Sequence, residues 1–212
     1  MLTSTLDHLV VTAPTLSAGI HYIEQQLGCI MQTGGQHVRM GTHNALLRIG
    51  EQCYLEVIAI DPAAAPVGRA RWFELDTLRS DDRPQLATWV VRTNDVRLAV
   101  EPAEPDLGTV EEMNRGSLDW LITIPSNGQL PFDGIAPALI QWKNEPHPAT
   151  RLAESSISLI QMTGCHPEAS RINAFLHRIG FAGDVSITEP FDGTTVCLLA
   201  TLQTPQGIVT LS

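Results

Sequence analysis

The chain has 212 residues, a length that suits one full domain or two to three small modules packed together. Hydrophobic residues make up 43% of it and charged residues 17%, a balance typical of folded proteins and unlike that of disordered ones. The net charge of -10 disfavours electrostatic binding to nucleic acid or to an anionic membrane. We therefore expect a folded protein with no nucleic-acid partner and no membrane partner.

The N-terminal residues and the cysteines bear on the cellular compartment. MLTSTLDHLVV lacks the positive and apolar regions of a signal peptide, and no apolar run is long enough to span a bilayer. The four cysteines are widely spaced, without a C-x-x-C motif. We interpret them as buried free thiols in a reducing compartment, with structural disulfides as the alternative, and expect a cytoplasmic protein.

Residues 5–61 predict a strand, a helix and three further strands. LDHLVVTA reads as a strand that ends at Pro14. A helix is predicted next, because apolar residues recur at helical spacing, at Leu16, Ile20, Ile23 and Leu27. Gly28 is the predicted end of this helix. CIMQT, MGTHNALLRIG and CYLEVIAID predict three strands, and the Gly34–Gly35 pair predicts a turn after the first of them.

Two later segments predict the same order of elements. Residues 62–86 form a connector, with a short helix in RARWFELDTL. Residues 87–143 predict a strand in ATWVVRT, a short helical run in VRLAVEPA, and strands near 108–113, in SLDWLITIP and in ALIQWK. Residues 144–153 predict a linker, and 155–212 repeat the pattern with a helix in PEASRINAFLHRIG.

We predict an α+β fold built from repeated β-α-β-β-β units. The first and third predicted helices share the spacing of their apolar residues and final glycine, which indicates internal repetition. Units 5–61 and 87–143 pair over a cleft and form one domain, residues 1–145. The third unit, 155–212, offers no histidine or acid in its first or last strand, so we expect it to be structural.

Several motifs in the first two units carry a family resemblance. They are LDHLVV with His8, GG-x-H with His37, GTHNALL with Thr42, His43 and Asn44, YLEVIA with Glu56, and the stretch from Arg115 through LDW to LIQW. With these motifs, the paired units resemble the glyoxalase-like domain family of the vicinal oxygen chelate (glyoxalase/bleomycin resistance/dioxygenase) superfamily. The resemblance covers residues 5–145.

The resemblance implies a site in the cleft, with metal ligands from the first and last strands of each unit. In the first unit those places hold His8 and Glu56, donors that suit Fe, Mn, Ni or Zn. In the second unit they fall near Thr88 and Gln141, a hydroxyl and an amide. The resemblance therefore implies a divalent metal whose third ligand the sequence does not identify.

Glu56 is the strongest candidate from the residues alone. It lies in CYLEVIAI, a strand with two apolar faces. An ionised carboxylate there is costly unless it is paired, hydrogen-bonded or bound to a metal, although a wet strand end would also tolerate it.

The histidines near the Gly-Gly pair are the other catalytic candidates. His37 and His43 would serve as a replacement ligand or a general base, or would lie at an exposed hairpin tip. Thr42 and Asn44 would hold a substrate oxygen or shape the turn. Elsewhere, His21, His147, His166 and His177 receive no site role.

The second unit supplies candidates for substrate binding. Arg115 would clamp a substrate carboxylate with two hydrogen bonds, or lie exposed like many arginines. Gln141 would bind substrate, hold a water or pair across the sheet. Trp142 would form a wall of the cleft or pack in the core.

Two classes of function follow. The first is an enzyme in which a divalent metal assists lyase, isomerase or dioxygenase chemistry on a small molecule. The second is a metal-free protein that binds or sequesters a small molecule. The density of polar residues at 37–44 favours the enzyme, and the neutral residues of the second unit favour the binding protein. An odd number of units is compatible with a homodimer.

Overall fold

The computed structural model describes residues 1–101, 106–143 and 146–212. The first segment folds as β1 (Ser4–Thr12), α1 (Leu16–Leu27), β2 (Gln32–His37), β3 (Thr42–Gly50) and β4 (Cys53–Ile60). The second folds as β5 (Gln85–Thr93), α2 (Val96–Ala99), β6 (Thr109–Arg115), β7 (Leu118–Ile124) and β8 (Ala138–Trp142). The third folds as β9 (Ser158–Cys165), α3 (Ala169–Arg178), β10 (Phe181–Ala182), β11 (Val185–Thr188), β12 (Cys197–Thr204) and β13 (Gly207–Leu211).

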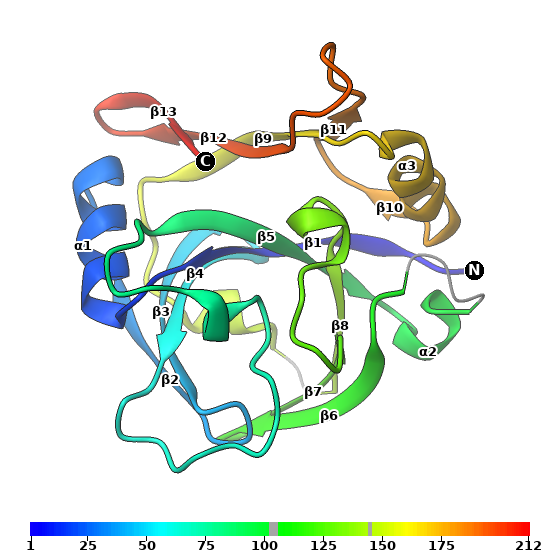
Figure 1. The fold of residues 1–212 in the computed structure, drawn as a ribbon. Coiled ribbons are helices and arrows are strands. Elements are labelled where there is room, and N and C mark those ends of the chain that lie inside the picture. Colours follow the sequence, from blue (N-terminus) through cyan, green and yellow to red (C-terminus); the bar gives the residue numbers. More distant parts are fainter. Residues whose placement is uncertain (102–105, 144–145) are drawn as a thin grey trace.

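The described strands form two sheets (Figure 1). The larger sheet has the order β2-β3-β4-β1-β5-β8-β7-β6, and β10 pairs with β1 beside this path. The first two segments join where β1 runs antiparallel to β5, and each also holds one parallel pair, β1 with β4 and β5 with β8. The predicted α+β class is confirmed, and the two segments share the predicted order of one strand, one helix and three strands.

The larger sheet curls until its edge strands β2 and β6 approach each other. Glu111 on β6 helps to hold this curl, because its carboxylate accepts two 2.7 Å hydrogen bonds from Arg69 of the β4–β5 connector. Arg39, in the turn after β2, donates to the Glu112 carbonyl at 2.9 Å. Strands of both of the first two segments therefore form the concave face of the sheet.

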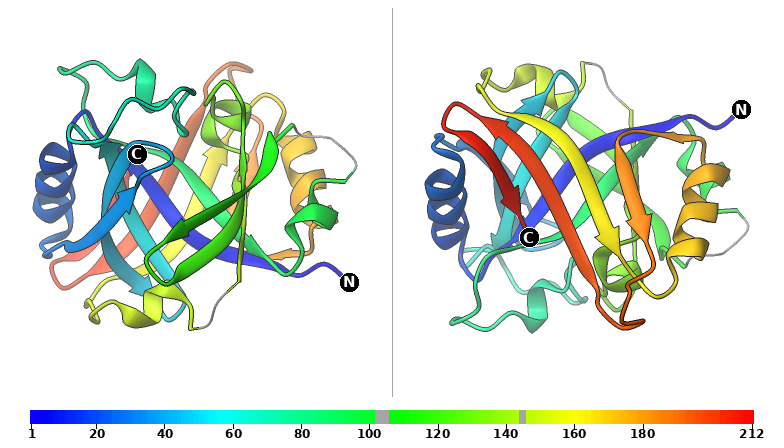
Figure 2. Two further views of the ribbon diagram at one scale, coloured as in Figure 1. Left: turned by 90° about the horizontal axis from the view of Figure 1, so that it is seen from below. Right: turned by 90° about the horizontal axis from the view of Figure 1, so that it is seen from above.

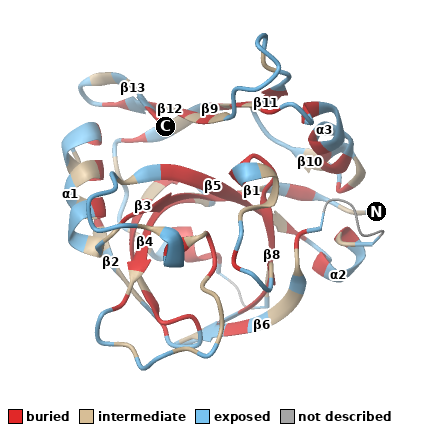
Figure 3. Cartoon of the chain, in the orientation of Figure 1, coloured by how far each residue is buried: buried red, intermediate tan, exposed pale blue. Residues whose placement is uncertain are grey.

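The smaller sheet, in the order β11-β9-β12-β13, lies across β1 and β5 (Figure 2). Leu9 and Trp89 of the larger sheet share a core with Met162 of β9 and Ile172 of α3, all fully buried. β1 and β5 are buried along most of their length (Figure 3) and have a packed layer on each face. A second core fills the concave face, with Val10, Ile58, Val90 and Ile140 among its members.

The two predicted amphipathic helices are confirmed as α1 and α3. The Thr15 hydroxyl caps α1 by accepting from the Ala18 amide at 3.2 Å, and Gly28 ends it at a φ of 62°. Ile23 and Leu27 face the core from this helix, as the spacing predicted.

The predicted Gly34–Gly35 turn is wrong, because both glycines lie inside β2. That strand also begins at Gln32, later than the predicted CIMQT strand. The turn follows His37 and ends at Gly41, whose φ is 60°. The physical reason is close packing: a Cβ on Gly34 would lie 2.0 Å from Asn44 Oδ1. These glycines make room for a side chain of β3.

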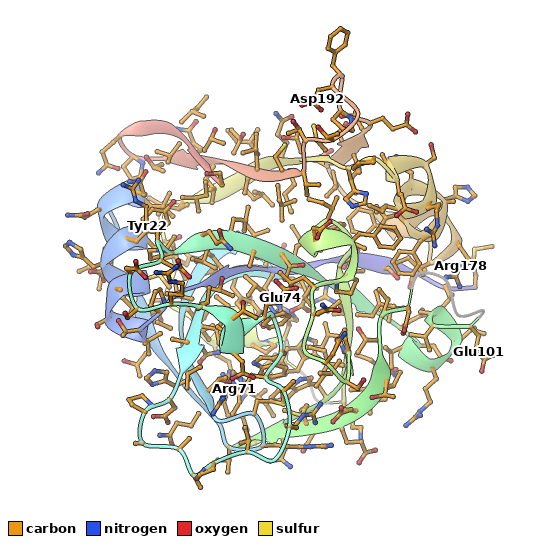
Figure 4. All side chains as sticks on the ribbon, in the orientation of Figure 1. Tyr22, Arg71, Glu74, Glu101, Arg178 and Asp192 are labelled. Carbon is orange, nitrogen blue, oxygen red and sulfur yellow. The ribbon has the colours of Figure 1, made fainter. Side chains whose placement is uncertain are left out.

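The predicted connector helix in RARWFELDTL is reduced to a short 3-10 helix, Leu75–Thr77. Phe73 and Glu74 precede it with φ values of 58° and 55°, which a right-handed helix does not allow. Arg71 and Glu74, labelled in Figure 4, flank Trp72 and Phe73 in this connector. The two aromatic residues are buried against the concave core.

Other connections also differ from the prediction. The helical run VRLAVEPA is observed as α2, and its last two residues lie outside the described part of the chain. The predicted boundary at 145 and the start of the predicted 144–153 linker also lie outside it. The rest of that linker holds a 3-10 helix, Pro148–Arg151.

None of the helices in residues 1–101, 106–143 and 146–212 has the length and hydropathy needed to cross a membrane. All four cysteines are free thiols, but the predicted burial is wrong, because each of them is only partly buried. Cys165 on β9 and Cys197 on β12 occupy directly opposite positions in the antiparallel register of these two strands.

Candidate functional site

A cavity of about 30 Å³ opens on the concave face of the larger sheet. Strands of both of the first two segments and the β4–β5 connector supply its lining, which comprises His8, His37, Asn44, Tyr54, Glu56, Trp72, Phe73, Arg115, Trp120, Ile122, Ile140 and Trp142. The first segment contributes most of the polar groups, and the second contributes apolar and aromatic side chains together with Arg115. The cavity is therefore polar on one wall and apolar on the other.

His8 is held by the carboxylate that precedes it in the chain. A register shift between Leu6 and His8 in the β1–β5 pairing lets Asp7 and His8 interact, although neighbouring side chains of a regular strand point to opposite faces. The Asp7 Oδ1 to His8 Nδ1 distance is 2.7 Å. An ionised carboxylate only accepts, so His8 Nδ1 carries a proton and the lone pair of neutral His8 lies on Nε2.

Asp7 accepts hydrogen bonds from two further donors. His147 Nε2 and Trp142 Nε1 each lie 2.9 Å from Asp7 Oδ2, and Arg92 Nη1 lies 3.9 Å from the same oxygen. Asp7 is completely buried, which on its own would raise its pKa. The hydrogen bonds from His147 and His8 outweigh burial and hold the pKa of Asp7 well below its ordinary value, so Asp7 is a buried anion.

His147 reaches Asp7 from the start of the 3-10 helix Pro148–Arg151. Its Nδ1 accepts a hydrogen bond from the Ala149 amide at 3.2 Å. With Nδ1 used as an acceptor, the proton of the neutral ring lies on Nε2 and points to Asp7. Local backbone geometry thus selects the tautomer that stabilises the Asp7 anion.

Glu56 faces His8 across the cavity. Its Oε2 lies 3.6 Å from His8 Nε2, beyond hydrogen-bond distance, and both side chains are buried. Asn44 Nδ2 donates a hydrogen bond to the other carboxylate oxygen, Oε1. Tyr54 stacks on His8 with ring centroids 4.5 Å apart, and burial raises the pKa of Tyr54 well above its ordinary value. The Tyr54 hydroxyl therefore stays protonated.

Asn44 also connects Glu56 to Arg115. Asn44 Oδ1 accepts from Arg115 Nη1 at 3.1 Å and from the Gly35 amide at 2.8 Å, so the amide can be oriented in only one way. Arg115 Nη1 also contacts His37 Nε2 at 3.3 Å. These contacts fix one end of the guanidinium at the cavity wall.

His37 is a neutral acceptor in this network. Burial lowers the pKa of His37 to about 4. The negative charge of Glu56 raises this pKa, and the positive charge of Arg115 lowers it. Because arginine only donates, His37 Nε2 accepts from Arg115, and Nδ1 donates to Thr42 Oγ1 at 3.2 Å. His37 therefore positions Arg115, and its free lone pair is already engaged.

The structure gathers six of the residues that the sequence proposed for the site. His8, Glu56, His37, Asn44, Arg115 and Trp142 all line the cavity. Thr42 lies behind His37 as its hydrogen-bond partner.

His43 and Gln141 are not among the lining residues. His43 is on the face of β3 opposite to Asn44, the face from which Ala45 packs into the core beneath α1. The Gln141 side chain accepts from the Val96 amide at 3.0 Å at the start of α2. Thr88, the expected second-unit position on β5, donates to the Gly134 carbonyl at 3.0 Å.

Sequence reasoning missed Asp7 and His147. Asp7 carried the same signal as Glu56, an acid inside an apolar strand, and the motif LDHLVV contains it. His147 carried no local signal, since it contacts a residue 140 positions away. The aromatic residues Trp72 and Phe73 were hidden in a segment read as a connector.

The donor set does not fit the metal site that the family resemblance implied. His8 Nε2 and Glu56 Oε2 are two suitable ligands. No group of three or more histidine, cysteine, aspartate or glutamate side chains that could hold a metal occurs in the described part of the chain. The remaining wall offers the cationic Arg115 and the apolar side chains of Ile140 and Trp142. A metal ion at His8 and Glu56 would therefore have only two protein ligands.

A larger hollow of about 750 Å³ lies beside α1, where Tyr22 is labelled in Figure 4. Its lining combines Asp82, Arg83 and the C-terminal Ser212 with uncharged residues. It has no buried histidine or carboxylate, so the chemistry concentrates in the smaller cavity.

Comparison with known proteins places this geometry in a family. The sequence matches the family model described as a glyoxalase-like domain over residues 6–180, a region that runs past the predicted boundary at 145. No curated protein matches the chain. A solved structure of a hypothetical protein from Staphylococcus aureus is similar, with a TM-score of 0.60 and 16% identity over 98% of this chain and 84% of that chain.

Two methylmalonyl-CoA epimerase structures are more distant. The enzyme from Mycobacterium tuberculosis has a TM-score of 0.44 and 16% identity over 66% of this chain and 88% of its own. A Streptomyces coelicolor variant in complex with 2-nitronate-propionyl-CoA has a TM-score of 0.45 and 17% identity over 68% of this chain and 100% of its own. The Staphylococcus likeness indicates a shared fold, and the family-model match covers more than half of the chain. The chain belongs to the glyoxalase-like domain family.

Proposed function

We propose that this protein is an enzyme that transfers protons to and from a small molecule in the cleft, as isomerases and lyases do. The observation that carries the proposal is the facing pair of proton acceptors, His8 Nε2 and Glu56 Oε2, 3.6 Å apart and buried. Buried acceptors that face each other without a donor are costly, so this pair holds a shared proton or admits a substrate group.

The surroundings of the pair favour acid–base chemistry. The Asp7 anion accepts from His8 Nδ1 and so orients the ring with Nε2 toward the cavity, as an aspartate does behind a catalytic histidine. Asn44 holds Glu56 on the opposite side. In the proposed reaction Glu56 removes a proton from a carbon next to a carbonyl, and protonated His8 returns a proton to the resulting enolate. A positioned acid or base of this kind contributes roughly 10²- to 10⁴-fold to a rate.

Metal-assisted lyase, isomerase or dioxygenase chemistry would need a third protein ligand beside His8 and Glu56. Arg115, which carries a positive charge, occupies the neighbouring wall instead. The proposal therefore assigns the proton transfers to protein side chains alone.

The test is hydrogen–deuterium exchange followed by proton NMR in D₂O. The probes are neutral (acetone and dihydroxyacetone) and carboxylate (pyruvate, acetoacetate and methylmalonate). We expect exchange with at least one probe, and a loss of about 100-fold or more in both His8→Gln and Glu56→Gln. Glu51→Gln, on the exposed β3–β4 turn, is the matched control and should keep the full rate. Equal rates in Glu56→Gln and the unaltered protein would contradict the proposal.

A second candidate function is metal-free binding of a small aromatic molecule. The aromatic lining favours it, since Tyr54, Trp72 and Trp120 surround the same cavity. Quenching of tryptophan fluorescence by a ligand that undergoes no exchange would support this candidate over the enzyme.

A further inference from the structure

We propose that the substrate of this cleft is a small carboxylate whose anionic oxygens bind Arg115 and Trp72. This inference rests on the proposed function, because it names a substrate class for the same cavity. Its basis is the buried indole N–H of Trp72, for which the described residues supply no acceptor, together with the half-buried guanidinium of Arg115 in the same cavity wall.

Arg115 is a half-buried cation without a carboxylate partner. No aspartate or glutamate in the described residues lies within 4 Å of its guanidinium nitrogens. Arg69, in contrast, makes two 2.7 Å hydrogen bonds to Glu111. The Nη1 group of Arg115 is engaged by His37 and Asn44, and the described chain supplies no partner for Nη2 and Nε. These two groups form the planar donor pair that suits a carboxylate.

Trp72 offers a second donor. The residue is 4% exposed, and its indole N–H has no hydrogen-bond partner among the described residues. Its ring lines the cavity and meets His37 edge-on, with centroids 5.0 Å apart. A buried N–H without an acceptor is unusual in folded proteins, and a ligand oxygen in the cavity would satisfy it.

The size and walls of the cavity agree with an acidic head group. About 30 Å³ holds one or two groups the size of a water molecule, which is close to the size of a carboxylate. Ile122, Ile140 and Trp120 form an apolar wall for the rest of a small substrate.

A structural role for Arg115 is the competing explanation. Asn44 connects Arg115 to Glu56, so the guanidinium would balance the Glu56 charge and bind no ligand. The two explanations differ in one respect: only ligand binding makes the unaltered protein prefer an acid to its neutral isostere.

The experiment measures dissociation constants by ligand-observed NMR for pyruvate against pyruvamide and acetate against acetamide. We expect each acid to bind the unaltered protein at least about 10-fold more tightly than its amide. Arg115→Met should weaken binding of the acids by about 10- to 100-fold, and Trp72→Phe by about 2- to 10-fold. Arg97→Met, which removes an exposed arginine on α2, should leave every constant unchanged.

Equal binding of acid and amide by the unaltered protein would overturn the inference, and so would unchanged acid binding in Arg115→Met. If Arg115→Met fails to fold, Arg115→Lys replaces it. Lysine keeps the positive charge but lacks the planar pair of N–H donors, so we expect a smaller loss of acid affinity than the loss predicted for Arg115→Met. Exchange of acetone without any binding of acids would overturn this inference and leave the proposed function standing. Binding of acids without exchange of any probe would support this inference and overturn the proposed function.

Discussion

At the scale of single residues, Asp7 organises the site more than any residue that the sequence singled out. It accepts from His8, His147 and Trp142 while fully buried. The two histidines around it have different roles: His147 is fixed by Ala149 as a neutral donor, whereas His8 keeps Nε2 available toward Glu56. The difference arises from what each second ring nitrogen meets.

His147 is a positioning residue, and its substitution tests that role. His147→Ala removes one donor from a buried anion, which should lower the free energy of unfolding by about 1–3 kcal/mol and the exchange rate by about 10- to 100-fold. His147→Gln keeps an N–H donor and should restore most of the rate. Urea denaturation and NMR exchange give the two readouts. An equal rate loss in both variants would contradict the assignment.

His37 makes the stability of the fold depend on pH. Its pKa falls from 6.5 when unfolded to about 4 when folded, so the unfolded chain binds the proton more readily between these values. The contribution of His37 to the free energy of unfolding is therefore fully present above pH 6.5. It decreases by about 3 kcal/mol as the pH falls to 4. Asp7 acts in a lower window: its contribution is present above pH 3.8 and is lost below it.

Urea denaturation at pH 7.0, 5.5 and 4.5 measures the His37 effect. His37→Gln should flatten the loss of stability over this range. His21→Gln, which changes an exposed histidine on α1, is the control and should keep the slope of the unaltered protein. A slope in His37→Gln equal to that of the control would contradict the account.

At the scale of elements, β2 and β3 form a pair whose close approach positions the site. The irregular register between Thr33 and Gln36 brings the backbone of Gly34 and Gly35 against the Asn44 side chain. Asn44 in turn holds Glu56 and Arg115. The Gly-Gly pair therefore serves the site through packing, since neither glycine has a positive φ.

Gly34→Ala tests this packing. The added Cβ would lie 2.0 Å from Asn44 Oδ1 and 2.8 Å from the Asn44 carbonyl, so Asn44 must move away from Glu56. We expect a loss of about 1–3 kcal/mol in the free energy of unfolding, together with a lower exchange rate. Gly68→Ala, where nothing lies within 4 Å of the new Cβ, should stay within about 0.5 kcal/mol of the unaltered protein. Equal stability of the two variants would contradict the packing argument.

Periodic elements could be predicted from the sequence, and irregular ones could not. The spacing of Ile20, Ile23 and Leu27 fixed the helix α1, because burial of one face repeats along it. The Gly34–Gly35 pair was misread, since a glycine in a turn and a glycine under a side chain look the same in sequence. The Trp72–Phe73 segment was misread for a related reason: its backbone is irregular and its burial depends on the opposite sheet.

At the scale of the whole molecule, pairing of β1 with β5 places polar residues of the first segment opposite the apolar wall of the second. The sequence predicted this pairing through repetition and family resemblance. It could not show that Gln141 faces α2 or that His147 reaches Asp7, because both depend on how separate segments pack.

Within residues 1–101, 106–143 and 146–212, no group of three or more histidine, cysteine, aspartate or glutamate side chains could hold a metal ion, and the cleft offers only the pair His8 and Glu56. We therefore expect protein purified without chelator to contain less than stoichiometric Fe, Mn, Ni and Zn, and its melting temperature to stay unchanged after chelator treatment. Elemental analysis and thermal denaturation measure both. Stoichiometric metal that disappears in His8→Ala and Glu56→Ala would contradict this expectation.

The most direct test of the central claim is the deuterium exchange rate of chelator-treated protein with its best probe, compared with that of Glu56→Gln. We expect the unaltered protein to keep its rate after chelator treatment, and Glu56→Gln to lose about 100-fold or more while remaining folded. A rate that vanishes with the metal, or a folded Glu56→Gln that exchanges as fast as the unaltered protein, would contradict the claim that His8 and Glu56 transfer the proton.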